Sequence, residues 1–498
     1  MWPQTATSPP RAGPGCFAAA SAFLVVVAAA IFIASGLARW GACGRLFEAA
    51  RLWGFGALDS WQRGAWKQDG AVDPAVGGSG LSVSWYAPFL SGGGYCSEAT
   101  AFVQGLSESG ATVHINHHGD AYQQDYVSGL PQSTYRLLAR LMRRPRAPGR
   151  SRGRVGPPGG PLVVVCHSEP GAWNGGMQRH DEGEQQQQKK GYTYTVGRTM
   201  FETDRLPSGW AARINSLDEA SRSTRLVWVP TEFHRRVFEA GGVSAQKIHL
   251  LAEPVDVDFF DPRRPLGLEA GEVRERPYPL GRTVGKDTFV FLSVFKWEDR
   301  KGWDVLLQAY MSEFASPWDD VALVLLTNPY HGDGDFARLI RAFAKEHGLG
   351  RYSITARLQL AVHPPLHPPP QERLPALYKS ADAFVLPSRG EGWGRPHVEA
   401  MSMELPILAT NWSGPTEYMT DENSYPLRAE AMQEVPSGAF KGHLWAKPSV
   451  EHLKELMRHV YTFPEEGREK GRRARQDMIR RFSPREVTRE LVAHLRRI

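Results

Sequence analysis

The chain has 498 residues, of which 42% are hydrophobic and 22% are charged, and this length predicts two or three domains. Much of the net charge of +6 comes from arginines in residues 140–154 and 468–481, a local run and a helix face, so we expect no nucleic-acid binding. The four cysteines are scattered without a C-x-x-C pair, which excludes a disulfide framework and a zinc site.

The first predicted element is a membrane anchor. Residues 16–37 contain no charged residue, and about 20 apolar residues suffice to span a bilayer. The segment is longer than the apolar core of ~7–15 residues typical of a cleaved signal. We therefore expect a cytosolic tail and signal anchor over residues 1–40 and a stem over 41–78, in a single-pass type II protein of the Golgi or endoplasmic reticulum. A cleaved signal and an organelle transit peptide remain as alternatives.

Residues 79–265 predict a first α/β domain. Apolar strands alternate with helices, which is typical of a parallel sheet covered on both faces. The expected strands are residues 81–86, 111–116, 162–166, 192–196, 226–230 and 247–251, and the clearest helices are 97–108 and 232–240. Two low-complexity inserts, residues 141–161 and 181–190, are predicted to be mobile loops. A linker rich in Pro, Gly and Arg follows over residues 266–285.

A second α/β domain is predicted over residues 286–480. Its expected elements are strands 288–294 and 321–327 and helices 303–314, 336–347 and 374–379. The tail, residues 481–498, reads as one further helix. It starts with a capping box at Ser483 and carries an apolar stripe, formed by Val487, Leu491, Leu495 and Ile498.

The most informative stretch is residues 388–400, which joins a short apolar strand, a glycine-rich loop and a helix N-terminus with Pro396 in its first turn. Such a loop lets backbone N–H groups approach an anion, and the helix dipole adds positive potential. Glu391 and Glu399 flank the turn. Because a phosphate would repel them, these carboxylates are better suited to accept hydrogen bonds from sugar hydroxyls.

This arrangement resembles the E-x7-E signature of retaining GT-B glycosyltransferases of the family-4 type, the glycosyl transferases group 1. The likeness extends to a Lys-x4-Lys-Gly segment within residues 293–302 and to a Gly-Pro-Thr-Glu loop at 414–417. It covers roughly residues 285–430 and continues more weakly from about residue 80 to the C-terminus. The resemblance implies two Rossmann-like, parallel-sheet domains that face a cleft. It also implies that the terminal helix crosses back onto the first domain.

The resemblance also assigns roles to residues. It implies that Glu391 contacts the donor sugar, that Glu399 binds the ribose, and that Lys296 and Lys301 neutralise the diphosphate. The implied donor site comprises Lys296, Lys301, Gly392, Trp393, Gly394, Glu399, Gly414, Thr416 and Glu417, and the implied catalytic set is Glu391, His167 and Lys301. Two positions depart from the family pattern. Lys296 replaces an arginine, for which Arg300 or Arg395 could compensate, and Glu404 replaces a small residue.

In the first domain, the glycines Gly92, Gly93 and Gly94 follow a strand and open a helix, as an incomplete dinucleotide fingerprint. The resemblance places this loop near the diphosphate and the acceptor. His167 ends an apolar strand at its carboxyl edge, where open α/β sheets bind ligands, although a lone histidine is often structural. Arg198 and Glu202 either face the cleft or form loop salt bridges.

The predicted function is retaining, metal-independent transfer of a hexose-type sugar from a nucleotide sugar to a glycan, lipid or protein acceptor, with no further cofactor. Two Asp-x-Asp sequences, at residues 256–258 and 333–335, are interpreted as turns and not as metal ligands. The alternatives are an inactive nucleotide-sugar-binding module, a nucleotide-sugar epimerase or phosphorylase, and a dinucleotide oxidoreductase.

Overall fold

The computed structural model describes residues 81–142, 162–173, 193–216, 225–264, 284–316, 318–329, 334–349, 357–360, 373–438 and 440–498. The chain divides into two units, residues 1–77 and 78–498, and all of these ranges belong to the second. The predicted anchor and stem, most of the linker and most of both inserts lie outside the described residues. Within the described ranges, no helix combines the length and apolarity that a membrane crossing requires.

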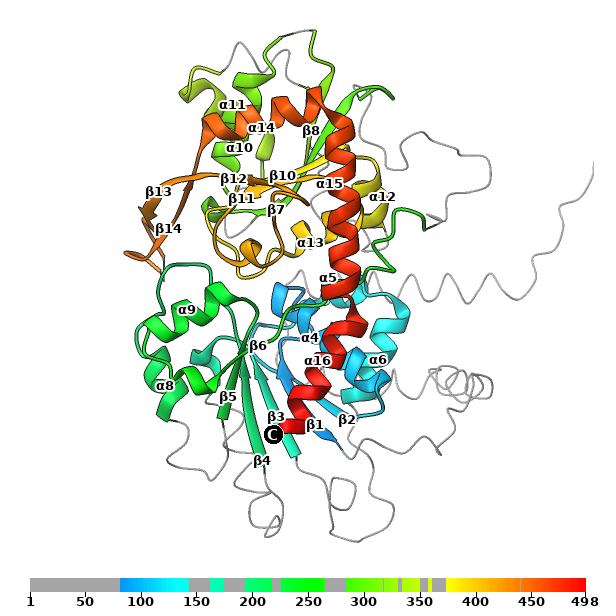
Figure 1. The fold of residues 1–498 in the computed structure, drawn as a ribbon, viewed down its shortest axis with the longest axis vertical. Helices are drawn as coiled ribbons and strands as arrows, with labels where there is room; N and C mark the ends of the chain where they lie inside the picture. The colour runs from blue at the N-terminus through cyan, green and yellow to red at the C-terminus, as the bar shows by residue number, and fades with distance from the viewer. Residues whose placement is uncertain are drawn as a thin grey trace, which may run out of the picture. The chain divides into compact units, whose positions relative to one another are not determined.

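The first half of the described chain, residues 81–264, is built on a six-stranded sheet. Its strand order is β2-β1-β3-β4-β5-β6, and all neighbours are parallel. The strands are β1 (Ser82–Ala87), β2 (Thr112–His117), β3 (Leu162–His167), β4 (Thr193–Arg198), β5 (Arg225–Val229) and β6 (Ile248–Leu250). The helices are α4 (Gly94–Glu108), α5 (Gln124–Ser128), α6 (Gln132–Met142), α8 (Trp210–Ser216) and α9 (Glu232–Ala240) (Figure 1).

The second half, residues 284–498, contains a second parallel sheet of six strands in the order β12-β11-β10-β7-β8-β9. Its strands are β7 (Phe289–Trp297), β8 (Val321–Pro329), β9 (Arg357–Leu360), β10 (Ala383–Leu386), β11 (Ile407–Thr410) and β12 (Tyr425–Leu427). The helices are α10 (Trp303–Glu313), α11 (Phe336–Glu346), α12 (Leu374–Lys379), α13 (Arg395–Ser402), α14 (Val450–Thr462), α15 (Pro464–Asp477) and α16 (Pro484–Arg497). The predicted α/β class with two parallel sheets is therefore confirmed.

The C-terminal helix returns to the first half, as the apolar stripe predicts. In Figure 1 the red helices α15 and α16 run from the second sheet to the first, where α16 packs on α4. Val487, Leu491 and Leu495 are at most 2% exposed in the core of the first half. Ser483 caps α16 by accepting a hydrogen bond from the Glu486 amide at 3.5 Å.

A two-stranded hairpin, β13 (Ala429–Glu434) with β14 (Leu444–Pro448), was not predicted from the sequence. It touches the first half at Asp204, whose carboxylate accepts a hydrogen bond from the Leu444 amide at 2.6 Å. The Asp204 amide in turn donates to the Leu444 carbonyl at 3.0 Å. The hairpin therefore joins the two halves next to the loop at residues 388–394, since Ala446 also bonds to the Arg389 carbonyl.

Glu404 adopts a left-handed backbone conformation, with φ of 62°. Side chains with a Cβ rarely adopt this conformation, so glycine would fit this position with less strain. The residue ends the turn after α13, and its carboxylate lies 3.8 Å from Arg475.

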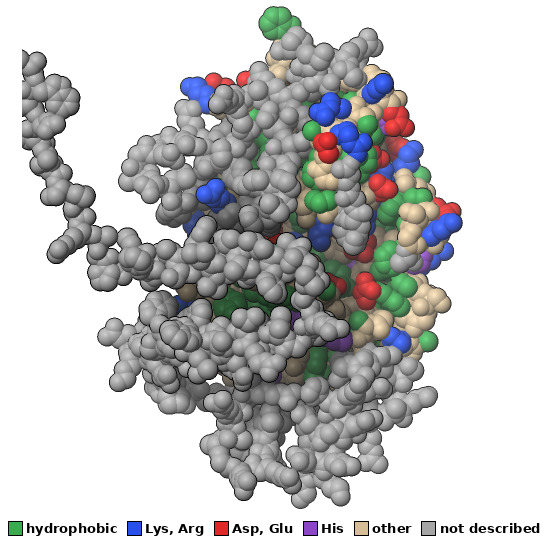
Figure 2. Space-filling view, turned by 180° about the vertical axis from the view of Figure 1, so that it is seen from behind, with side chains coloured by type: hydrophobic (Ala, Val, Ile, Leu, Met, Phe, Trp, Pro, Cys, Tyr) green, Lys and Arg blue, Asp and Glu red, His purple; other side chains and the backbone are tan. Residues whose placement is uncertain are grey.

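The described surface carries both signs of charge. In the space-filling view of Figure 2, Lys and Arg side chains lie among Asp and Glu side chains. On α14 and α15 these charges form short-range pairs, such as Lys454 with Glu451 at 2.8 Å and Arg472 with Glu469 at 2.7 Å. Exposed pairs of this kind contribute typically less than ~1 kcal/mol each.

Candidate functional site

The loop between β10 and α13 lies against the first half, and its glycines are required for that approach. A Cβ on Gly390 would lie 2.2 Å from the carbonyl oxygen of Glu202, and one on Gly392 would lie 2.6 Å from the sulfur of Met200. Gly394 has φ of 98° and is the N-cap of α13. The glycine-rich sequence therefore brings the start of α13 against residues 200–202.

Glu391 is the centre of an ion cluster. Its two carboxylate oxygens lie 2.7 and 2.8 Å from Lys301 Nζ, and one lies 3.1 Å from Arg300 Nη1. Burial alone would raise the pKa of Glu391, but Lys301 and Arg300 outweigh burial and lower it to about 2. Burial and the neighbouring Arg300 lower the pKa of Lys301. Glu391 is therefore anionic at neutral pH and faces two cations.

Arg300 holds the cluster together. Besides Glu391 it binds the Gly390 carbonyl at 2.7 Å and Glu298 at 2.8 Å, and it lies 3.9 Å from Glu202 of the first half. Lys296 is an exposed residue near the end of β7, after the buried Phe295. The cations that the structure places on Glu391 are thus Arg300 and Lys301.

Glu399 lies in a different environment, one helical turn after Arg395. It accepts a hydrogen bond from the Tyr378 hydroxyl at 2.9 Å, and Arg395 Nε lies 3.9 Å from its other oxygen. Burial raises the pKa of Glu399, against the opposing effects of Arg395 and Tyr378. Glu253, in the segment that leaves the first sheet, lies 3.5 Å from Arg395.

The loop at 413–417 packs behind Glu391. The Glu391 amide donates to Ser413 Oγ at 2.9 Å, and the Gly414 amide donates to the Glu391 carbonyl at 3.0 Å. Thr416 is exposed, and its hydroxyl donates to the Ser413 carbonyl at 2.7 Å. Glu417 faces the first half instead, where it accepts from the Glu232 amide at 3.1 Å at the start of α9.

His167 is fully buried inside the first half. Its Nε2 lies 2.7 Å from Glu98, and the Trp85 indole donates to its Nδ1 at 3.3 Å. Arg198 is also fully buried and donates to Glu98 at 2.8 Å. The structure therefore groups His167 and Arg198 around Glu98 and does not bring them to Glu391. Burial lowers the pKa of His167, so the ring is neutral at pH 7.

The Gly92–Gly94 loop is connected to the Glu391 loop through Met200. Gly92 has φ of 71°, and Gly93 precedes the first residue of α4. Tyr95, in the first turn of α4, donates to the Met200 carbonyl at 3.3 Å, and the Met200 side chain packs on Gly392. The glycine loop and the Glu391 loop thus meet at the same short segment.

Sequence reasoning missed Glu98, Glu253, Tyr378 and His397. Glu98, Glu253 and Tyr378 stand in no recognisable motif, and the partners of Glu98 are about 70 and 100 positions away. His397 did lie inside the glycine-rich stretch. It is fully buried, and burial lowers its pKa to about 4.

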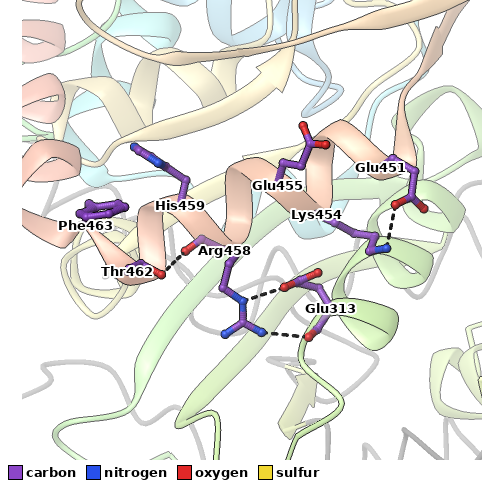
Figure 3. A pocket seen from close by; sticks show the side chains of 8 residues that line it. All are labelled: Glu313, Glu451, Lys454, Glu455, Arg458, His459, Thr462 and Phe463. Atoms are coloured by element: carbon purple, nitrogen blue, oxygen red, sulfur yellow. Dashed lines mark hydrogen bonds and ion pairs between the residues drawn. The ribbon is translucent and has the colours of Figure 1, made fainter.

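A hollow on α14 has a different character (Figure 3). Two ion pairs lie in it, since Arg458 binds Glu313 at 2.7 Å and Lys454 binds Glu451 at 2.8 Å. Its lining residues come from α14, from Phe463 directly after it and from Glu313 at the end of α10, whereas Glu391 lies on a loop between a strand and a helix.

Residues 286–435 match the family model described as glycosyl transferases group 1. The chain is 29% identical over 184 residues to a D-inositol 3-phosphate glycosyltransferase of Xylanimonas cellulosilytica, covering 36% of this chain and 39% of that protein. It is 28% identical to a GDP-mannose-dependent alpha-(1-6)-phosphatidylinositol monomannoside mannosyltransferase of Mycolicibacterium smegmatis, covering 37% and 44%. The chain thus spans about two fifths of the length of the curated relatives it matches.

Solved structures share the fold. Anabaena HepE in complex with UDP and glucose superposes with a TM-score of 0.55 at 12% identity, over 84% of this chain and 100% of that one. Sucrose-phosphate synthase from Thermosynechococcus elongatus superposes with a TM-score of 0.53 at 14% identity, over 84% of this chain and 98% of that one. Residues 286–435 are therefore similar to the glycosyl transferases group 1, and the described residues share the fold of these solved structures.

Proposed function

We propose that this protein transfers a hexose-type sugar from a nucleotide sugar to a hydroxyl group of a glycan, lipid or protein, with retention of anomeric configuration and without a metal ion. The observation that carries the proposal is the contact of Lys301 with Glu391 at 2.7 and 2.8 Å, joined by Arg300 at 3.1 Å, beside the first turn of α13. These groups are the ones that a leaving diphosphate requires.

The chemistry follows from the charges. When the glycosidic bond to the diphosphate breaks, negative charge grows on the phosphate oxygens, and fixed cations and a helix N-terminus stabilise it without reorganising. Lys301 and Arg300 are held in place by Glu391 before the donor arrives, and Lys296 is proposed from the family resemblance as a further cation. The anionic Glu391 can then accept hydrogen bonds from the donor sugar, and Glu399 can accept them from the ribose.

The donor base and the acceptor are left open by this proposal. UDP is bound by HepE, whereas the M. smegmatis relative is named for GDP-mannose, and this chain covers less than half of that relative. A panel of UDP-, GDP- and ADP-sugars, followed as hydrolysis in the absence of acceptor and in the presence of EDTA, is the test. We expect one nucleotide class to be hydrolysed, with the anomeric configuration of the transfer product retained by NMR.

Lys301→Met should lower this activity by at least ~10- to 100-fold, because a charge-assisted contact is lost. Lys454→Met, on α14, is the control and should leave activity unchanged. Loss of activity in EDTA that manganese restores, or an inverted product, would contradict the proposal. Binding of a nucleoside diphosphate without any turnover would favour the inactive module.

We also propose that residues 16–37 anchor the protein in the Golgi or endoplasmic reticulum membrane, with the later residues in the lumen. The proposal rests on the uncharged run alone, which lies outside the described residues. Protease protection of residues 81–498 in intact microsomes is expected, and their digestion without detergent would exclude a lumenal location.

A further inference from the structure

We propose that Arg395 is a further donor-binding residue, which contacts the diphosphate of the nucleotide sugar; the inference rests on the function proposed above. Arg395 is the first residue of α13, directly after Gly394, and it lies one turn before Glu399. Its guanidinium therefore lies within ion-pair distance of the carboxylate assigned to the ribose, at the helix end assigned to the phosphates.

The contacts of Arg395 are incomplete. Its Nη1 lies 3.5 Å from Glu253 and its Nε lies 3.9 Å from Glu399, both at ion-pair distance. Nη1 is nevertheless buried without a hydrogen-bond partner, and so is the facing oxygen of Glu253, a residue only 2% exposed. Buried polar atoms are nearly always hydrogen-bonded, so two unsatisfied atoms facing each other need an explanation.

Two buried arginines of the second half make shorter contacts than Arg395 does, although Nε of Arg389 has no partner. Arg389 binds both oxygens of Asp304, at 2.9 and 2.6 Å, and Arg475 donates to the carbonyls of Phe260 and Ser402, the first at 2.9 Å and the second at 2.6 Å. Such bidentate geometry is where a guanidinium gains most of its binding energy. Arg395 lacks it, and so remains able to form it with an incoming group.

A second observation lies at the same end of α13. His397 is fully buried, and neither of its ring nitrogens makes a hydrogen bond in the structure. A Cβ on Gly394 would lie 2.7 Å from His397 Nδ1, so this nitrogen points to the first turn of the helix. Unsatisfied side-chain groups thus gather where the helix dipole favours an anion.

The electrostatics also favour a diphosphate over a carboxylate as the partner. Burial and the nearby Glu98 raise the pKa of Glu253 well above its usual range, so Glu253 holds Arg395 less firmly than an ordinary carboxylate would. A diphosphate presents several charged oxygens and matches the guanidinium fork. Arg395 would then supply the bidentate contact that Lys296, as a point charge, cannot make.

The alternative is that Arg395 only orients Glu399. The two are separated by measuring binding of a nucleoside, its monophosphate and its diphosphate by calorimetry, with the base that the wild-type protein prefers. We expect Arg395→Met to weaken binding of the nucleoside diphosphate by roughly 10- to 100-fold. Binding of the nucleoside should weaken by less than about twofold. The diphosphate affinity of Arg395→Lys should lie between those of the wild type and Arg395→Met. Arg489→Met, on the exposed face of α16, should have the affinity of the wild type.

Equal losses for nucleoside and diphosphate would overturn the proposal, because Arg395 would then act through Glu399. An unchanged diphosphate affinity would overturn it as well. If Arg395→Met does not fold because Glu253 is stranded, the double variant Arg395→Met with Glu253→Gln removes both charges, and the same comparison applies. If the wild-type protein binds no nucleotide at all, the proposed function fails; if it binds but the variant shows no phosphate-dependent loss, only the role of Arg395 fails.

Discussion

Glu391 and Glu399 stand eight positions apart, but their surroundings differ in charge. Lys301 and Arg300 outweigh burial at Glu391 and lower its pKa to about 2, whereas burial prevails at Glu399 and raises its pKa. A carboxylate next to two cations and one next to a tyrosine hydroxyl offer different contacts to a ligand. We therefore expect the two glutamates to serve different purposes.

Substituting each glutamate should separate these purposes. Glu399→Ala should weaken binding of the free nucleoside diphosphate by roughly 10- to 100-fold, because a hydrogen bond to a charged group is lost. Glu391→Ala should lower turnover, because its partner would be the sugar, and should weaken binding of the free nucleoside diphosphate less than Glu399→Ala does. Calorimetry with the nucleoside diphosphate, together with initial rates, provides the measurement, and Glu430→Ala on the exposed face of β13 is the control. Equal loss of affinity in both variants would reverse our assignment.

His397 should make stability depend on pH. Its pKa in the folded state is about 4, below the ordinary 6.5 that the unfolded chain has, because burial disfavours the charged ring. The unfolded chain therefore takes up a proton first as pH falls. The contribution of neutral His397 to the free energy of unfolding is fully present above about pH 6.5. It is lost as pH falls towards 4, by ~3 kcal/mol at most.

The measurement for His397 is urea unfolding at pH 7.5 and pH 5. His397→Gln should lose less stability than the wild type between these two values, since Gln does not titrate. His459→Gln, at a partly exposed residue on α14, should keep the wild-type difference. Parallel pH profiles for wild type and His397→Gln would show that the ring is not buried as a neutral group.

At the scale of the elements, the sequence predicts best those strands and loops whose local residue pattern matches their burial in the fold. The short apolar run of β10 is typical of a buried strand, and the glycines after it permit a close approach of the backbone. The end of β7 also alternates between apolar and polar residues, which indicates which side chains face the solvent. Phe295 points inward and Lys296 outward, so the strand itself indicates that Lys296 is exposed.

Other features could not be predicted because their partners are distant in the chain. His167 ends an apolar strand, as expected of a ligand-binding residue, but Glu98 engages it from 69 positions away. The strand β13 carries polar residues and is mostly exposed, so it has no alternating pattern. Its pairing with β14 and its contact with Asp204 exist only in the folded chain.

The terminal helix α16 offers a prediction for one element. Leu491 is fully buried in the core of the first half, so Leu491→Ala should reduce the free energy of unfolding by ~2–5 kcal/mol. Arg489→Ala, two positions earlier with its side chain 79% exposed, should change it by no more than ~0.5 kcal/mol. Denaturant midpoints compare the variants. Similar midpoints for both would mean that α16 is not bound to the first half in solution.

At the scale of the whole molecule, the halves meet through a few contacts that surround the site. Phe201 packs on Phe440 with ring centroids 5.0 Å apart, Thr203 bonds to His443 at 2.8 Å, and Phe233 packs on Trp412 at 5.1 Å. Interfaces within a chain that are partly polar usually permit relative motion. A donor pocket between the halves would need that motion to admit and release its ligand.

Asp204 is the residue whose loss should loosen this interface without touching the charged cluster. Asp204→Ala removes the acceptor of the Leu444 amide, bonded at 2.6 Å, while Glu391, Lys301 and Arg300 keep their contacts. Hydrogen exchange at the Leu444 amide should speed up by roughly 10-fold, since a lost hydrogen bond is worth ~1–1.5 kcal/mol. Turnover with the preferred nucleotide sugar should fall as well, because closure over the donor becomes less favourable.

Asp421→Ala, at an exposed turn away from the interface, serves as the control and should leave both exchange and turnover at wild-type values. Faster hydrogen exchange at Leu444 with unchanged turnover would show that the contact of the hairpin with Asp204 does not affect the reaction. Unchanged exchange would show that the backbone pair between Asp204 and Leu444 is sufficient, since the Asp204 amide still donates to the Leu444 carbonyl at 3.0 Å. Only the combined change in exchange and turnover would tie the contact between the halves to catalysis.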